Sequence, residues 1–168
     1  MYSSKWKMWK TIIDLKTCLI CRQNNGKIYG IKDKVHPSPP IHPNCRCIIE
    51  KMKSLLAGMA TKDGAYGADF YLKVYGKLPD CYISKDTAER LGYKSYLGNL
   101  SLVAPNKMLF KGIYYNTNKH LPNAPNRIWY EADINYISGY RGTDRILFSN
   151  DGLIFVTYDH YETFIEVE

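Results

Sequence analysis

Four side chains near the C-terminus of this 168-residue chain are of the types that RNA cleavage without a metal requires. They are one carboxylate, Glu131, two guanidinium groups, Arg141 and Arg145, and one imidazole, His160. A carboxylate can take a proton from a ribose 2′-hydroxyl, and an imidazolium can protonate the leaving oxygen. Guanidinium groups can stabilise the charge that builds on the phosphate between them. We therefore expect these side chains to converge on one phosphate.

These residues also have an interpretation in which they do no chemistry. Glu131 and Asp133 lie two apart, so on a strand they share one face, and most such pairs belong to a solvated sheet face. The two arginines that follow favour a different interpretation, in which one carboxylate forms a structural ion pair while the other does chemistry. His160 alone is uninformative, and it becomes a candidate proton donor only in this company.

The elements that position these residues follow from the pattern of apolar and turn residues. An apolar stripe at residues 70–75, ended by Gly76, predicts a helix. Ser84 is placed to cap a second helix that ends at Gly92, and Asn99 to cap a short third one. After Pro105 the apolar period becomes two, with turn signals at 138–139, 141–142 and 150–152, which is typical of antiparallel strands. We expect an α+β fold in which N-terminal helices pack on a four- to five-stranded antiparallel sheet.

Charge and cysteine usage divide the chain near residue 60. Residues 1–60 hold 11 Lys and Arg against 3 Asp and Glu, a net charge of +8, whereas residues 61–168 hold 12 against 13, a net charge of −1. Four of the five cysteines also lie before residue 60. We expect a small basic cysteine module at 1–60 and a second domain at 61–168, joined by a linker at 57–64. No apolar run is long enough to span a membrane, and residues 1–10 do not read as a secretion signal.

From about Gly67 onward, roughly 60% of the chain, the sequence resembles the barnase-like family of microbial guanyl-preferring ribonucleases. The matching segments include YLKVYGKLPD (71–80), YISK (82–85), VAPNK (103–107), EADINY (131–136), SGYR (138–141), DRIL (144–147) and TYDHYETF (157–164). Agreement over segments of this length is specific. The resemblance implies the microbial ribonuclease fold and an endoribonuclease that cleaves single-stranded RNA to a 2′,3′-cyclic phosphate.

The resemblance also assigns roles to individual residues. It implies that Glu131 is the general base and His160 the general acid, so the rate should depend on pH with a bell-shaped profile. It implies that Lys85, Arg141 and Arg145 surround the phosphate, so that no cofactor is needed for catalysis. Asp133 then has a structural role. Substrate-binding residues implied by the family are Tyr161, which stacks on the base, and the loop residues Tyr114, Asn116 and Asn118.

Two positions depart from the family. Asn118 stands where the family has a glutamate that binds guanine, and an amide offers one acceptor where a carboxylate offers two. We therefore expect weaker or altered base preference. Gly112 stands where the family has an aspartate that pairs with the lysine matching Lys85, so Lys85 lacks that partner here.

The cysteine module carries two close pairs of thiols, Cys18 with Cys21 and Cys45 with Cys47. This spacing predicts a structural zinc site, with His42 as an alternative ligand. Two disulfides and free thiols are the alternatives. The segments TCLIC (17–21) and PPIHPNCRC (39–47) are similar to the end of Mu F-like phage head-morphogenesis proteins, in which toxin enzymes sometimes follow the module.

These features favour a toxin effector whose partners are RNA and a cognate acidic inhibitor, of the barstar type or another immunity protein. Such a chain would be secreted, or delivered with a larger phage-derived protein, and would act in the target cytoplasm. The alternative function is a non-catalytic structural or adaptor module of a phage particle. No membrane partner is expected.

Overall fold

The computed structural model describes all residues, 1–168. Its strands are β1 Tyr2–Lys10, β2 Ile28–Gly30, β3 Ile48–Leu55, β4 Tyr82–Ser84, β5 Met108–Tyr114, β6 Trp129–Asp133, β7 Arg145–Ser149, β8 Ile154–Thr157 and β9 Ile165–Val167. Its helices are α1 Leu19–Asn24, α2 Ala68–Tyr75, α3 Lys85–Arg90 and α4 Leu100–Val103, with 3-10 turns η1 Gly64–Tyr66 and η2 Ser95–Leu97. None of the helices is both long enough and apolar enough to cross a bilayer.

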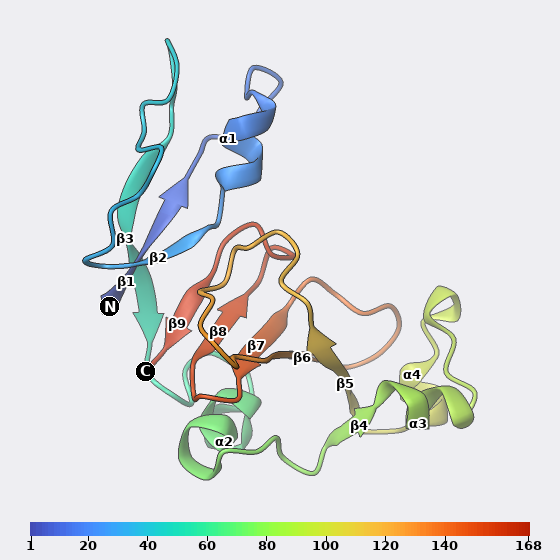
Figure 1. The fold of residues 1–168 in the computed structure, drawn as a ribbon. Coiled ribbons are helices and arrows are strands. Elements are labelled where there is room, and N and C mark those ends of the chain that lie inside the picture. Colours follow the sequence, from blue (N-terminus) through green and yellow to red (C-terminus); the bar gives the residue numbers. More distant parts are fainter.

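All strands join one sheet in the order β2-β1-β3-β9-β8-β7-β6-β5-β4 (Figure 1). The predicted α+β class is confirmed, but the predicted count of four to five strands is wrong, because the sheet has nine. The run from β5 to β9 is antiparallel throughout. Two parallel pairs extend it: β4 lies on β5, and β3 of the cysteine module lies on β9. Because β3 pairs with the edge of β9, the sheet continues into the cysteine module. The strand pattern of residues 61–168 alone could not reveal this pairing.

The three predicted helices of the C-terminal part are confirmed. Ser84 caps α3 by accepting a hydrogen bond from Thr87 N, and Gly76 ends α2 in the left-handed conformation. The buried face of α2 differs from the predicted stripe: Ala68, Asp69 and Leu72 are its buried residues. Asp69 is buried because its carboxylate accepts hydrogen bonds from Gly58 N, Ala60 N and Thr61 Oγ1, so it ties the predicted linker to the start of α2.

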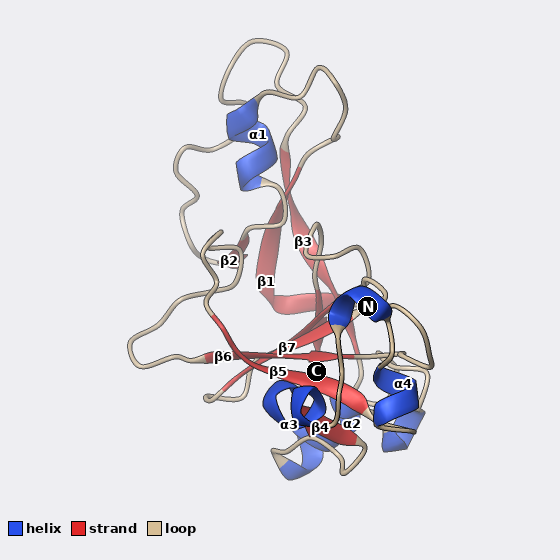
Figure 2. Cartoon of the chain, turned by 90° about the vertical axis from the view of Figure 1, so that its right-hand side faces the viewer, coloured by secondary structure: helices blue, strands red, loops and turns tan.

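The two faces of the sheet have different cores. Ala132, Ile146 and Val156 lie directly opposite one another on β6, β7 and β8 and pack with Ala68 and Leu72 of α2. On the other face, Leu147 and Phe155 pack with Trp129, with Leu121 from the β5–β6 loop, and with Ile28 and Met52 from the cysteine module. The cysteine module rises from the end of the sheet away from α2, as the side view shows (Figure 2). The side chains of Ile28 in β2 and Met52 in β3 therefore pack on the same face of the sheet as the charged residues of β6 and β7.

Candidate active site

Strand β6 places Glu131 and Asp133 on one face of the sheet, as the spacing predicts. Both are buried, with Glu131 4% exposed and Asp133 1% exposed. Arg145 of β7 lies directly opposite Asp133 in the register, so its side chain emerges on the same face. Its Nε is 3.2 Å from Asp133 Oδ1 and 3.4 Å from Glu131 Oε1. Since neither contact has hydrogen-bond alignment, Arg145 stabilises the pair of carboxylates by charge.

Asp133 forms the tightest ion pair of the site. Arg141 Nε and Nη2 donate to its two carboxylate oxygens at 2.5 Å each, a bidentate arrangement. Burial alone would lower the pKa of Arg141, but its hydrogen bonds to Asp133 and the charge of that carboxylate outweigh burial and raise the pKa. Both oxygens of Asp133 are thus committed to Arg141, which leaves Glu131 as the carboxylate of the pair that can exchange a proton.

Lys111 contacts Glu131, although the sequence did not single it out. Its Nζ lies 2.8 Å from Glu131 Oε1. The register between β5 and β6 shifts between Phe110 and Gly112, so Lys111 is the extra residue of a β-bulge. Gly112 has φ +86°, a conformation that glycine adopts readily, and this allows the bulge. Sequence offers one signal for Lys111: it directly precedes Gly112, the glycine that stands where the family has an aspartate and that allows the bulge.

Lys85 is not brought into this cluster. Its Nζ lies 3.6 Å from Glu89 Oε1, one turn further along α3, and its side chain is 54% exposed. Gly112 has no side chain with which to hold Lys85 toward β5. Lys111 therefore supplies the lysine charge beside Glu131.

His160 lies in the turn between β8 and β9, exposed and without a protein hydrogen bond to its ring. His160 and Tyr161 both have positive φ values, +58° and +74°. Asp159 and Thr157 hold this strained turn: Thr157 Oγ1 donates to Asp159 Oδ1 and accepts from Tyr161 N, both at 2.9 Å. The His160 ring is 4.7 Å from that of Tyr161. The turn thus presents the imidazole to solvent beside Tyr161.

Tyr161 connects His160 to Glu131. Its hydroxyl donates to Glu131 Oε1 at 2.5 Å, while its ring stacks on Tyr114 with centroids 5.7 Å apart. Burial raises the pKa of Tyr161, and its hydrogen bond to Glu131 raises it further. The ring predicted to stack on a base therefore stacks on Tyr114.

The other predicted substrate-binding residues lie in the β5–β6 loop. The side chain of Asn116 is buried, accepts from Leu121 N and donates to Leu121 O, so its amide shapes the loop. Asn118 is exposed and lines a pocket together with Thr117 and His120. Asn116 is thus committed to holding the loop, whereas Asn118 remains available to a ligand.

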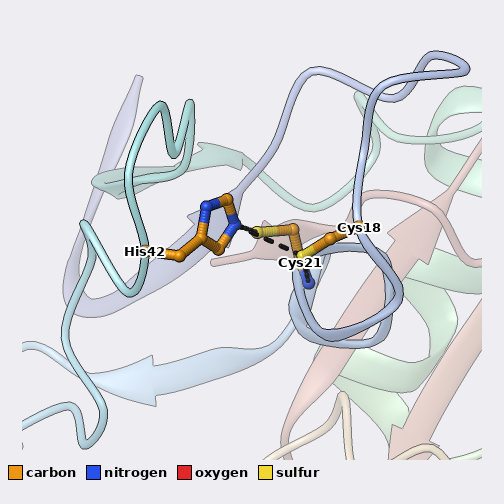
Figure 3. Close-up of side chains that lie close together, drawn as sticks. All are labelled: Cys18, Cys21 and His42. Carbon is orange, nitrogen blue, oxygen red and sulfur yellow. Dashed lines mark hydrogen bonds between the residues drawn. The ribbon is translucent and has the colours of Figure 1, made fainter.

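The cysteine module brings its predicted ligands together. His42 Nε2 is 3.3 Å from Cys18 Sγ and 3.1 Å from Cys21 Sγ (Figure 3). Cys21 Sγ is 3.9 Å from Cys45 Sγ, and Cys47 completes a second close group with both. None of the five cysteines forms a disulfide. Two sulfur ligands about 2.3 Å from a tetrahedral zinc ion lie roughly 3.8 Å apart. The distance between the sulfurs of Cys21 and Cys45 is therefore that of two thiolates on one zinc ion.

The surroundings of these thiols also fit a metal. His42 Nδ1 lies 2.8 Å from Pro43 O, an arrangement that keeps the proton on Nδ1 and leaves Nε2 for a ligand bond. A hydrogen bond from the backbone of Ile41 is the main cause that lowers the pKa of Cys45 to about 7. Cys47 Sγ instead contacts Thr11 Oγ1 at 2.6 Å. The five candidate donors thus form two close groups, one of Cys18, Cys21 and His42 and one of Cys21, Cys45 and Cys47, which share Cys21.

Comparison with known proteins agrees with this geometry. The sequence profile of the ribonuclease family matches residues 69–168, and that of the phage Mu protein F like proteins matches residues 1–50. Ribonucleases from Bacillus intermedius and Bacillus pumilus are each 46% identical to the chain over 112 residues, 67% of this chain and 67% of their own length. A ribonuclease from Heyndrickxia coagulans is 46% identical over 101 residues, 60% of this chain and 93% of its own. The profile match covers the whole charged cluster, so this chain belongs to the barnase-like family of microbial ribonucleases and is an endoribonuclease.

Proposed function

We propose that the chain cleaves single-stranded RNA by transesterification without a metal, with Glu131 as general base and His160 as general acid. The observation that supports this best is the environment of Glu131. A buried carboxylate contacts two cations, Lys111 and Arg145, and one hydroxyl, Tyr161. The cations compensate the charge that a proton acceptor must carry before it can act.

The hydroxyl of Tyr161 marks the place of the attacking group. It donates to Glu131 Oε1 as a ribose 2′-hydroxyl would have to do before losing its proton. Substrate binding therefore displaces Tyr161 from Glu131, and the freed ring leaves Tyr114 to stack on the base. The 2′-oxygen then attacks the adjacent phosphorus, the bond to the 5′-oxygen breaks, and His160 gives that oxygen a proton. The product is a 2′,3′-cyclic phosphate.

The arginines retain donors for the phosphate. Arg141 uses Nε and Nη2 for Asp133, and Nη1 has no protein partner. Arg145 uses Nη1 for the carbonyl of Asp144, which leaves Nη2. Held by buried partners, these planar donors stabilise the charge on the non-bridging oxygens without reorganising during the reaction. Lys85 pairs with Glu89 away from these side chains, so Lys111, which contacts Glu131, supplies the lysine charge of the site.

Digestion of RNA in the presence and absence of EDTA tests this function. We expect cleavage that persists in EDTA and yields ends with a 2′,3′-cyclic phosphate. A matched DNA strand should remain intact, because it lacks the attacking hydroxyl. Cleavage that stops in EDTA, or that leaves no cyclic phosphate, would contradict the mechanism. A folded chain without any cleavage would favour the adaptor role instead.

In the cysteine module we propose a structural zinc ion, held by Cys18, Cys21 and Cys45 with His42 or Cys47 as fourth ligand. The ion would organise the module and take no part in the cleavage step. Elemental analysis should find one zinc per chain, and Cys21→Ser should lose it, because Cys21 belongs to both ligand groups. Metal-free protein with unchanged thermal stability of the module would contradict this.

The order of the two parts supports an effector role. A module similar to phage Mu protein F like proteins precedes a ribonuclease in one chain, an arrangement suited to delivery of the enzyme as a toxin. A producer of such an enzyme needs an inhibitor, and an acidic protein would cover Arg141, Arg145 and His160. Binding of such an inhibitor should weaken as salt is raised, and cleavage should stop when it binds.

A further inference from the structure

A polar pocket lies where the cysteine module meets the β5–β6 loop. Its volume is about 460 Å³, and no apolar side chain lines it. The lining residues are Arg22, Gln23 and Lys27 from the module and Thr117, Asn118 and His120 from the loop. In Figure 1, α1 lies above the loops that carry the predicted base-binding residues. The ribonuclease part alone would form only one wall of this pocket.

Hydrogen bonds to two backbone carbonyls, together with a close approach of the backbone at Gly26, fix the module against these loops. Ile28 N donates to His120 O at 2.8 Å, and Asn25 Nδ2 donates to Glu162 O at 3.2 Å. Gly26 has φ +81°, and a Cβ there would lie only 2.5 Å from Glu162 O. Such a close approach between backbones requires glycine. The two walls of the pocket are therefore held in one arrangement.

The two cations of the pocket have no carboxylate partner. Arg22 donates to the backbone carbonyls of Asp14 and Thr17. Lys27 Nζ donates to Asn24 Oδ1 at 2.8 Å. Glu162 is close to the module, but its carboxylate contacts the Asn25 amide and does not line the pocket. The pocket is thus lined by two cations and by no carboxylate.

The other lining groups of the pocket are polar. His120 is 9% exposed, and its ring lies against the backbone of Gln23 and of Tyr161. The amides of Gln23 and Asn118 and the hydroxyl of Thr117 make the lining rich in hydrogen-bonding groups. Two cations with neutral polar groups, and no carboxylate, are the chemistry that recognises an anion.

We infer that this pocket binds a backbone phosphate of the RNA substrate other than the one that is cleaved, so that the cysteine module forms part of the ribonuclease's substrate site. The inference rests on the proposed function. The loop that lines the pocket begins at Tyr114, which stacks on Tyr161, which in turn contacts Glu131. A strand whose scissile phosphate lies at Glu131 and whose base lies at this loop therefore passes the pocket. The site has no open aromatic face, so it suits a phosphate better than a base.

The test compares two substrates with the full chain. One is a dinucleoside monophosphate, which has only the scissile phosphate, and the other is a longer single-stranded oligoribonucleotide. The variant is R22Q/K27Q, whose glutamines can still bond to the backbone carbonyls and to Asn24. The matched control is K73Q/K77Q, which removes two exposed charges on and just after α2, at the opposite end of the molecule (Figure 1).

We expect the kcat/KM of R22Q/K27Q on the oligoribonucleotide to fall about five- to tenfold at low salt. The slope of log kcat/KM against log salt concentration should become less steep by about 0.7, the value for one phosphate contact on a single strand. Its cleavage of the dinucleoside monophosphate should match that of the unsubstituted chain, which also shows that it folds. An equal rate for R22Q/K27Q and the control on the oligoribonucleotide, with an unchanged salt slope, would overturn the inference while the ribonuclease function stands. Failure of the unsubstituted chain to cleave either substrate would instead refute the proposed function.

Discussion

The hydroxyl of Tyr161 donates a 2.5 Å hydrogen bond to Glu131, so the residue proposed to stack on the base covers the carboxylate proposed to take the proton. The ring of Tyr161 is stacked on Tyr114 at the same time. In the proposed mechanism neither contact persists when a nucleotide binds, because the 2′-hydroxyl takes the first position and the base takes the second. By this proposal Tyr161 must move away from both Glu131 and Tyr114 before RNA is cleaved.

Substitution of Tyr161 separates these two contacts. Tyr161→Phe removes the hydrogen bond and keeps the ring, so we expect KM for a dinucleoside monophosphate to stay equal or fall. Tyr161→Ala removes the stacking surface, worth about 1–3 kcal/mol per base, so KM should rise about fivefold or more. Steady-state kinetics measures both. A phenylalanine variant as impaired as the alanine variant would show that the hydroxyl, and not the ring, serves the substrate.

Asp133 is predicted to matter for stability. Asp133→Asn leaves Arg141 without its charge partner and Arg145 with Glu131 alone, which should lower the free energy of unfolding by about 3–5 kcal/mol. The matched control is Asp151→Asn, which breaks the ion pair of Asp151 with Arg127. The side chain of Asp151 is 45% exposed, so this substitution should lower the free energy of unfolding by about 1 kcal/mol or less. Urea denaturation gives both values. Similar losses in the two variants would mean that Asp133 is not the structural partner we infer.

The two lysines beside the site should differ in their effect on cleavage. Lys111→Met removes the ammonium group 2.8 Å from Glu131, and we expect kcat/KM to fall about tenfold or more. Lys85→Met removes an exposed lysine paired with Glu89, and the rate should change little. The resemblance to the family alone predicts the reverse order. That order, if measured with both proteins folded, would refute the role of Lys111.

Stability should fall in mildly acidic solution because of His120. Burial lowers the pKa of His120, and the charge of Lys27 lowers it further, while hydrogen bonds to the backbone of Gln23 and Tyr161 and the charge of Glu162 oppose them in part. An unfolded histidine titrates near 6.5, so below about pH 6.5 the unfolded chain binds a proton that the folded chain does not. The stabilising contribution is therefore present above that pH and is lost as the pH falls through the pKa of the folded state. His120→Gln should flatten the dependence of unfolding free energy on pH in this range.

A control distinguishes His120 from the other imidazoles. His36→Gln removes an exposed ring and should keep the slope of the unsubstituted chain. An identical slope in the His120→Gln protein and the unsubstituted chain would contradict the prediction.

Local signals carried most of the fold prediction. Ser84 and Gly76 bound their helices because capping and left-handed termination depend on residues within a few positions. The pairing of β3 with β9 joins residues more than 100 apart, and nothing in either segment encodes which edge meets which. The strand count failed for this reason.

The candidate site likewise has features that local sequence predicts and features that it does not. The face shared by Glu131 and Asp133 follows from strand alternation, and the arginine pairing follows from opposite charge. Lys111 was missed because its direction depends on a β-bulge at Gly112, and a bulge reverses the face that alternation assigns. The wall that Arg22 and Lys27 add to the pocket depends on how the cysteine module docks, which only the three-dimensional arrangement shows.

The most direct test of the proposed mechanism is the rate of RNA cleavage by Glu131→Gln and His160→Ala proteins that fold normally by circular dichroism. A positioned general base or acid contributes roughly 10²- to 10⁴-fold, so each variant should cleave at least about a hundredfold more slowly than the unsubstituted chain. Full cleavage by either folded variant would contradict the assignment of that residue and the mechanism with it.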